Sequence, residues 1–172
     1  MRILFYIAAA IFAIAAIVLI IGLALPKAHS AIVVARYHAP PERIYKAIAD
    51  VEAGTRWRSG LQKVEVLSRE PLTWRETADW GTITFVRDEA VPNQLIKTRI
   101  ADEDQGFGGT WTYMLSPQDS TTTFLTITEK GTVSNPLFRF MSKFVFGHYT
   151  SMETYARDLG KLLGERTEPT RM

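Results

Sequence analysis

The sequence contains no cysteine, and its 20 Lys and Arg residues nearly balance its 18 Asp and Glu residues. Without cysteine, disulfides, thiolate metal ligands and cysteine nucleophiles are excluded. The basic residues form no clustered stripe of the kind that nucleic-acid phosphates require, so no nucleic-acid partner is expected. The sequence also lacks a phosphate-cradling glycine motif, a nucleophile elbow and paired histidine ligands. We therefore expect no cofactor.

Charge is absent from Ile3 to Leu25, a run of 23 residues. As a helix this run would measure about 34 Å, enough to cross a hydrocarbon core of about 30 Å. The run predicts that residues 1–26 form a single-pass transmembrane anchor, with residues 3–25 in the lipid bilayer. Residues 27–30 would be a short linker that holds the following domain close to the membrane surface.

A cleaved secretory signal is the alternative interpretation of the same run. Ala28 and Ser30, just before Ala31, are small residues at suitable cleavage positions. The apolar stretch of a signal usually has only about 7 to 15 residues, which favours the anchor. Basic residues lie on both flanks of the run, so the positive-inside rule does not determine the side of the membrane that carries the domain.

Three acids gather in residues 101–109, "ADEDQGFGG". The segment lacks the spaced oxygen ligands of a calcium loop and has no nearby histidine, so it predicts a solvated hairpin loop and no metal site.

Residues 31–133 alternate in a pattern typical of an antiparallel sheet. Residues 31–39 are β-branched and apolar, and the prolines that follow begin a helix over residues 41–51. Six strand-like segments then follow Gly60 without an intervening helix. Together with the first strand, they predict a seven-stranded sheet with one dry face.

One long helix is predicted for the end of the chain. Asn135 is a good N-cap and Pro136 a good first residue, and apolar residues recur at steps of three and four as far as Leu163. Gly147 lowers helix propensity in the middle and would allow a bend. Residues 165–172 are expected to be a flexible tail.

This element order resembles that of the START-like superfamily, also called SRPBCC or polyketide cyclase/dehydrase-like. The residues that carry the resemblance are "APPERIYKAIADV" (39–51), Trp57, "GTWTYMLSP" (109–117), "TTTFLTITEKG" (121–131) and "NPLFRF" (135–140). The resemblance covers residues 30–163 and implies an α+β helix-grip fold for residues 31–164. In that fold, a curved antiparallel sheet surrounds the long C-terminal helix.

The resemblance also implies a cavity between the sheet and the long helix, occupied by a hydrophobic small molecule such as a lipid, quinone or isoprenoid. A short tether would keep this cavity near a bilayer that supplies the ligand. Strand alternation and the helix stripe predict the lining residues, although the same residues would also suit a solid core. They are Trp74, Phe85, Trp111, Tyr113, Phe140, Phe144, His148 and Met152.

Three of the residues on these faces could exchange protons, namely His148, Glu76 and Tyr113. Their convergence in one cavity would indicate an enzyme of the polyketide cyclase or dehydratase type. The alternatives are a structural role for His148 and a solvent-exposed edge position for Glu76. A domain with a filled core that only contacts other proteins is a third possibility, and the sequence predicts no particular protein partner.

Overall fold

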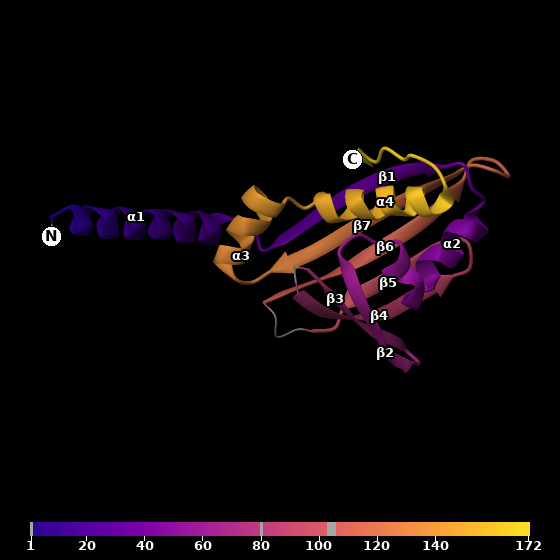
Figure 1. Ribbon diagram of the computed structural model, residues 1–172, viewed down its shortest axis with the longest axis horizontal. Helices are drawn as coiled ribbons and strands as arrows, with labels where there is room; N and C mark the ends of the chain where they lie inside the picture. The colour runs from indigo at the N-terminus through magenta and orange to yellow at the C-terminus, as the bar shows by residue number, and fades with distance from the viewer. Residues whose placement is uncertain (1, 80, 103–105) are drawn as a thin grey trace.

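The computed structural model describes residues 2–79, 81–102 and 106–172. Its elements follow in the order α1 (Arg2–Ala24), β1 (Ala28–Tyr37), α2 (Pro41–Ala49), η1 (Glu52–Arg56), β2 (Leu61–Arg69), β3 (Leu72–Ala78), β4 (Gly81–Val91), β5 (Leu95–Ile100), β6 (Phe107–Pro117), β7 (Thr123–Val133), α3 (Pro136–Met141), the π-turn η3 (Ser142–Phe146), α4 (Thr150–Leu163) and β8 (Thr170–Arg171). The α+β helix-grip arrangement expected from the sequence is confirmed (Figure 1).

The sheet is antiparallel throughout and has eight strands in the order β2-β3-β4-β5-β6-β7-β1-β8. The predicted count of seven was therefore one too low. The eighth strand comes from the segment expected to be a flexible tail, where Thr170 and Arg171 pair with Val34 and Val33 of β1. A two-residue strand carries too little periodicity to be recognised in a sequence.

The sheet begins earlier than the sequence indicated, because β1 starts at Ala28. Ala28, His29 and Ser30 pair with β7, so these residues of the expected linker belong to the domain. The backbone N–H of Val133 also donates to the carbonyl of Lys27 at 2.8 Å. Almost no free chain is left between α1 and the sheet.

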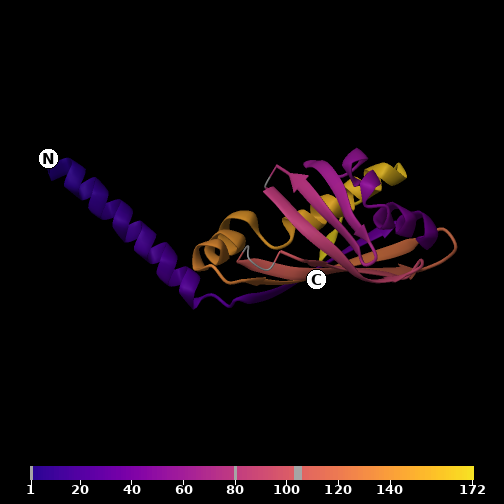
Figure 2. The ribbon, with the colours of Figure 1, turned by 90° about the horizontal axis from the view of Figure 1, so that it is seen from below.

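The core lies between one face of the sheet and the helices α2 and α4. Along β1, Ala31, Val33, Ala35 and Tyr37 are buried in alternation, and Leu125 and Ile127 of β7 are fully buried on the same face. The helix α4 lies across this face (Figures 1 and 2), and it contributes Met152, Tyr155, Ala156 and Leu159. Alternate side chains of the strands thus pack against one stripe of side chains on α4.

The C-terminal helix is interrupted, which corrects the prediction of one helix from Pro136 to Leu163. Asn135 caps α3 as expected, since its side chain accepts from the N–H groups of Leu137 and Phe138. Gly147 then ends the π-turn with φ 72° and ψ 153°, a backbone conformation that in practice only glycine adopts. Only α4, after this break, packs on the sheet.

The helix α1 extends away from the domain as a rod (Figures 1 and 2). It is long and apolar enough to cross a membrane, and a helix of this kind near an N-terminus is also compatible with a signal sequence. At its C-terminal end, α1 contacts α3. The phenylalanine-rich segment formed by α3 and η3 therefore lies beside α1 instead of covering the sheet.

Candidate functional site

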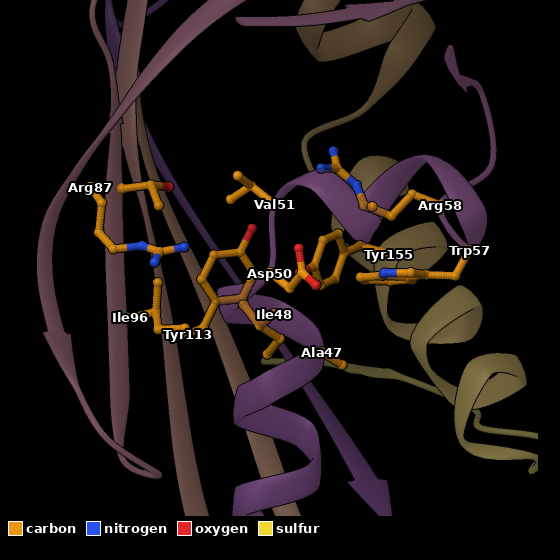
Figure 3. A pocket seen from close by; sticks show the side chains of 12 residues that line it. Ala47, Ile48, Asp50, Val51, Trp57, Arg58, Arg87, Ile96, Tyr113 and Tyr155 are labelled. Atoms are coloured by element: carbon orange, nitrogen blue, oxygen red, sulfur yellow. The ribbon is translucent and has the colours of Figure 1, made fainter. Parts of the chain in front are cut away.

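A small cavity lies between α2, η1, the sheet and α4 (Figure 3). Its volume is about 30 Å³, enough for roughly two water molecules and far below that of a ligand site. Its lining combines apolar side chains with two arginines, two tyrosines and an aspartate. The lining residues are Ala47, Ile48, Asp50, Val51, Gly54, Trp57, Arg58, Arg87, Ile96, Thr98, Tyr113 and Tyr155.

Strand register places the sheet side of this lining. Ile96 of β5 pairs with Tyr113 of β6, and Tyr113 pairs in turn with Ile127 of β7. The opposite side comes from the C-terminal end of α2 and from Trp57 and Arg58, which follow η1. One wall of the cavity is thus a continuous sheet, and the other is a short 3₁₀ turn.

A buried ion pair holds Arg58 in this lining. Its two terminal nitrogens donate to the two carboxylate oxygens of Glu76 at 2.7 and 2.8 Å, and Glu76 is only 3% exposed. Trp74 Nε1 donates to the same carboxylate at 2.9 Å. Burial opposes the charge of Arg58, but the hydrogen bonds to Glu76 raise the pKa of the guanidinium. The Glu76 carboxylate is therefore committed to structural partners.

The chain after η1 is also tied to α4. The buried Asp158 accepts from the backbone N–H of Ser59 at 2.7 Å and from Lys161 Nζ at 2.8 Å. Burial acts against the ionised carboxyl, yet these hydrogen bonds lower the pKa of Asp158. The pair formed by Ser59 and Asp158 thus sets the position of Trp57 and Arg58 over the cavity.

Two tyrosines meet at the centre of the site. The rings of Tyr113 and Tyr155 lie 5.3 Å apart, with their planes tilted at 41° to each other. Burial raises the pKa of both hydroxyls well above the ordinary value of 10.0. Both groups are therefore neutral near pH 7, and each can donate a hydrogen bond but cannot act as a resting anion.

Two N–H groups beside the cavity have no hydrogen-bond partner among the described residues. These are Nε1 of Trp57 and Nε of Arg87, and both atoms are buried. Arg87 donates through Nη2 to the carbonyl of Ala49 at 2.8 Å, but none of the described carboxylates forms a salt bridge with it. Burial lowers the pKa of Arg87. The cavity wall therefore presents one cation, Arg87, and two buried N–H donors that lack a hydrogen-bond acceptor among the described residues.

Of the residues predicted to line the cavity, Tyr113 does so. Trp74 and Phe85 pair across β3 and β4 and stack at 5.6 Å, as strand alternation suggested, but they lie behind Arg87, whose guanidinium sits 5.8 Å from the Trp74 ring. Glu76 is buried and points inward, not towards solvent at the edge of the sheet. Arg58 lies between Glu76 and the cavity.

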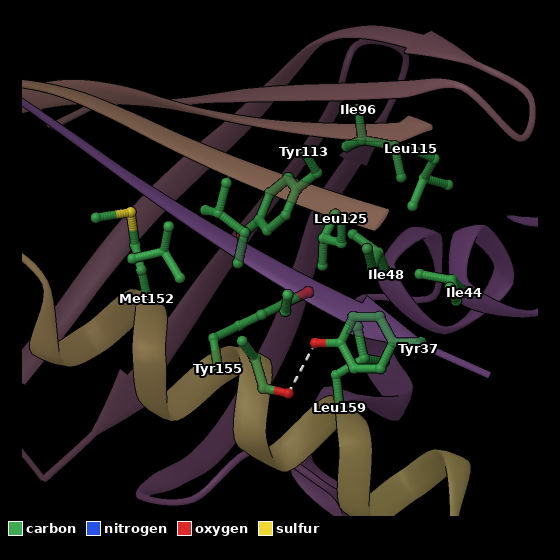
Figure 4. Packing of buried hydrophobic residues seen from close by; sticks show 14 of the residues in the cluster. Tyr37, Ile44, Ile48, Ile96, Tyr113, Leu115, Leu125, Met152, Tyr155 and Leu159 are labelled. Carbon is green, nitrogen blue, oxygen red and sulfur yellow. Dashed lines mark hydrogen bonds between the residues drawn. The ribbon is translucent and has the colours of Figure 1, made fainter. Parts of the chain in front are cut away.

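Two other predicted lining residues belong to the core instead. Met152 is fully buried, and Trp111 is partly buried against the same cluster, 6.2 Å from the ring of Tyr155. Figure 4 shows how closely this cluster packs, with the hydroxyl of Tyr37 donating to the carbonyl of Ala156 at 2.8 Å. Towards α1, the sheet under α4 is covered less completely, since Phe107 to Thr112 of β6 are only partly buried.

The remaining predicted residues lie outside the cavity. Phe140 and Phe144 stack on each other at 4.9 Å in the segment beside α1. His148 lies near the same end of the domain, where its ring stacks on His29 at 4.0 Å and its Nδ1 contacts the hydroxyl of Ser142 at 3.2 Å. His29 contacts Glu129 at 3.0 Å. His148 is therefore not part of the same group as Glu76 and Tyr113.

The sequence analysis did not identify the two arginines or Tyr155 as site residues. Arg87 follows Phe85 by two positions on one strand and so shares its face, a signal that was available. Tyr155 lies within the helix predicted for residues 136–163, but it was not named among the lining residues. Arg58 lies in an irregular turn, where no periodicity reveals the direction of a side chain.

No group of three or more His, Asp or Glu side chains that could hold a metal ion occurs in the described part of the chain. Residues 103–105 of the acidic loop lie outside that part.

Solved structures share this fold at low sequence identity. A START superfamily protein from Mycobacterium smegmatis matches with a TM-score of 0.62 at 17% identity, covering 80% of this chain and 97% of that one. Norcoclaurine synthase from Thalictrum flavum matches with a TM-score of 0.63 at 11% identity, covering 86% and 92%. The Zhui aromatase/cyclase from Streptomyces sp. R1128 matches with a TM-score of 0.57 at 18% identity, covering 62% and 68%.

No curated protein matches this chain in sequence. One family profile, described as polyketide cyclase / dehydrase and lipid transport, matches residues 37–152. The matched range runs from the end of β1 into α4 and includes every residue that lines the cavity except Tyr155. The chain therefore belongs to the polyketide cyclase/dehydrase and lipid transport family, and it shares the fold of a START superfamily protein.

Proposed function

We propose that this chain is a membrane-anchored binding protein for a hydrophobic small molecule of the lipid, quinone or isoprenoid class that carries an oxygen acceptor at one end. The observation that carries the proposal is the pair of buried, unpartnered donors beside the cavity, Trp57 Nε1 and Arg87 Nε. A family whose description includes lipid transport supports the apolar body of the ligand.

The energetic reason for an acceptor is the cost of leaving buried donors unpaired. Each such group costs about 1 to 3 kcal/mol, and more when it is charged. Trp57 and Arg87 lie on opposite sides of the cavity (Figure 3), so each donor needs its own acceptor, and a carbonyl or carboxylate oxygen at Arg87 would place a partial or full negative charge beside the arginine. The apolar remainder of the ligand would contribute about 0.8 kcal/mol for each methylene that it buries.

The ligand must enlarge the cavity, since about 30 Å³ holds only roughly two water molecules. The wall that moves in this proposal is η1 with Trp57, because η1 is short and irregular, whereas Arg58 is tied to Glu76 and the opposite wall is an eight-stranded sheet. Displacement of Trp57 towards solvent would open space against Tyr155, whose ring it contacts at 5.1 Å. Binding therefore requires movement of η1.

The cavity faces away from the proposed membrane anchor, contrary to the expectation that the tether keeps it at the bilayer surface. Tyr113 lies at the register of Val33, five residues along β1 from Ala28, or about 17 Å from the start of β1. Met152 is buried at the end of α4 nearer to α1. We therefore place the entrance at α2 and η1, on the side remote from lipid.

Native mass spectrometry of the full-length protein, purified in mild detergent from its own membrane, tests the proposal. A stoichiometric passenger that can be extracted into organic solvent is expected. Arg87→Met should lose the passenger, whereas Arg75→Met, on an exposed position of β3, should retain it. Repeated recovery of protein without a ligand would contradict the binding proposal. Recovery of a soluble chain that lacks its first 30 residues would contradict the membrane anchor.

An enzyme of the cyclase or dehydratase type is the second candidate, favoured by the neutral hydroxyls of Tyr113 and Tyr155 beside two arginines. Such hydroxyls can donate a proton towards a developing negative charge. If the passenger changes mass during incubation, for example by loss of water, and Tyr113→Phe prevents this, the enzyme interpretation holds. A passenger that keeps its mass supports binding alone.

A further inference from the structure

We infer that the segment Pro136–Phe146, which comprises α3 and η3, lies in the interfacial layer of the lipid bilayer beside the C-terminal end of α1. This inference rests on the proposed role of α1 as a membrane anchor, and it adds a second membrane contact that fixes the position of the domain. The segment Pro136–Phe146 is called the interfacial segment below.

The interfacial segment exposes large apolar side chains at four positions. Leu137 is 50% exposed, Phe138 49%, Phe144 57% and Val145 57%. The other exposed large apolar side chains of the described domain lie singly on separate elements: Leu67, Met114, Leu162 and Met172. Isolated apolar residues are ordinary on a protein surface, but a cluster indicates contact with another apolar phase.

Direct contacts fix this segment to α1. Gly22 is buried against the carbonyl group of Pro136, where a Cβ atom would find no room. The buried Arg139 donates from Nη1 to the carbonyl of Leu25 at 2.7 Å and from Nη2 to the carbonyl of Ser134 at 3.3 Å. A cation at the C-terminal end of a helix is favourable, because the last carbonyl groups carry partial negative charge.

The depth of the segment follows from the length of α1. From Ile3 to Gly22 there are 20 residues, which span about 30 Å, the thickness of a hydrocarbon core. Gly22 therefore lies at the boundary between hydrocarbon and headgroups when α1 spans the bilayer. Since Pro136 contacts Gly22, the interfacial segment lies at this boundary as well, and Figures 1 and 2 both place α3 at the base of α1.

The charge pattern fits a lipid surface. From Asn135 to Tyr149 the sequence contains no Asp or Glu, and of its two basic residues Lys143 is exposed whereas Arg139 is buried against α1. The ammonium group of Lys143 lies 5.8 Å from the centre of the Phe144 ring, so a basic group accompanies the exposed aromatic ring. Apolar side chains with flanking basic residues are typical of elements that lie in the plane of a membrane interface.

The consequence is a domain that cannot swing freely on a tether. The junction at Gly22 and Arg139 fixes one end of the sheet to the membrane surface, and the cavity stays remote from lipid. A ligand exchanged at α2 and η1 would then pass to or from the aqueous side.

Because the chain lacks cysteine, single nitroxide labels test this inference in the full-length protein. Cysteine is introduced at Phe144, at Val145 and, as an exposed control on α4, at Leu162, in vesicles of phosphatidylcholine and phosphatidylglycerol. We expect the labels at Phe144 and Val145 to show a several-fold higher ratio of oxygen accessibility to water-soluble nickel-complex accessibility than the label at Leu162. Circular dichroism confirms that each labelled protein is folded.

A nitroxide label at Ile14, within the proposed anchor, tests the anchor separately from the interfacial segment. If the Ile14 label is deep in the bilayer while Phe144 and Val145 are as accessible to nickel as Leu162, the proposed position of the interfacial segment is wrong and the membrane anchor stands. If Ile14 is also accessible to nickel, the anchor itself fails. If Phe144 and Val145 are shielded from both reagents and show spin-spin broadening, a second copy of the chain covers this surface, which also overturns the inference.

Discussion

At the scale of single residues, the bidentate pair between Arg58 and Glu76 should contribute strongly to stability. Glu76→Gln removes the countercharge of a largely buried guanidinium, because Glu76 is 3% exposed. We expect the free energy of unfolding to fall by about 3 kcal/mol, as measured by denaturant titration of the full-length protein in detergent.

Glu65→Gln is the matched control for this substitution. It removes a carboxylate from the neighbouring strand, where Glu65 and Lys63 pair at 3.2 Å in an exposed position. Exposed pairs contribute less than about 1 kcal/mol. Equal losses for the two variants would show that the pair with Arg58 is solvated and does not order the cavity wall.

The lowered pKa of His148 predicts that the stability of the protein depends on pH. Burial, aided by His29 and Lys143 and opposed by Glu129, lowers the pKa of His148 below its ordinary value of 6.5. The unfolded chain therefore binds a proton more readily than the folded chain, so stability present above pH 6.5 is lost as the pH falls through the lowered value.

Denaturant titrations over a series of pH values measure this effect. His148→Gln should flatten the loss of unfolding free energy below pH 6.5. His38→Gln, which removes an exposed histidine beside Glu165, provides the comparison. An unchanged slope in His148→Gln would assign the acid sensitivity to other groups.

At the scale of elements, the break in the C-terminal helix depends on Gly147. Its φ of 72° and ψ of 153° belong to a region that only glycine populates readily, whereas Gly164, with φ 87° and ψ 21°, has the left-handed conformation that asparagine tolerates. Gly147→Asn should therefore lower the free energy of unfolding by about 1 to 3 kcal/mol, and Gly164→Asn by less.

Thermal unfolding of the two variants, followed by circular dichroism, compares these costs within one protein. If Gly147→Asn proves harmless and adds helical signal, then α3 and α4 can join into one helix, and the position of the interfacial segment would not be fixed by the backbone.

The elements also show what a sequence can and cannot reveal. Alternation in β3 and β4 correctly placed Trp74 and Glu76 on one face, and Asn135 correctly marked the start of a helix. Periodicity failed at the apolar residues from Leu137 to Val145, because it reports that a face is covered and not what covers it. Those residues lie next to α1 instead of the sheet.

The cavity was harder to predict than the fold for a related reason. Arg58 and Arg87 are charged, and charged residues are usually exposed, so their inward position depends on the particular partners Glu76 and the carbonyl of Ala49. Such partners are far apart in sequence and become visible only in three dimensions.

At the scale of the whole molecule, the contact between Gly22 and Pro136 should hold the domain against α1. Gly22→Leu places a side chain where the carbonyl of Pro136 lies, so it should separate α3 from α1. Ala24→Leu, at an exposed position of the same helix, should not. The measurement is the distance distribution between spin labels at Ile14 and Phe138.

We expect a narrow distribution in the parent protein and in Ala24→Leu, and a broad one in Gly22→Leu. A distribution that is broad in all three proteins would mean that the domain moves freely on its anchor.

The most direct test of the central claim, that oxygen acceptors of a hydrophobic ligand pair with the buried donors of Trp57 and Arg87, is the indole N–H resonance of Trp57 in a nitrogen-15 correlation spectrum. Trp57→Phe assigns the resonance, and a lipid extract of the membrane from which the protein is purified supplies the ligand. The account predicts a downfield shift of the Trp57 signal, whereas the Trp74 signal, already bonded to Glu76, stays in place. A Trp57 signal that does not move at saturating extract would contradict the account.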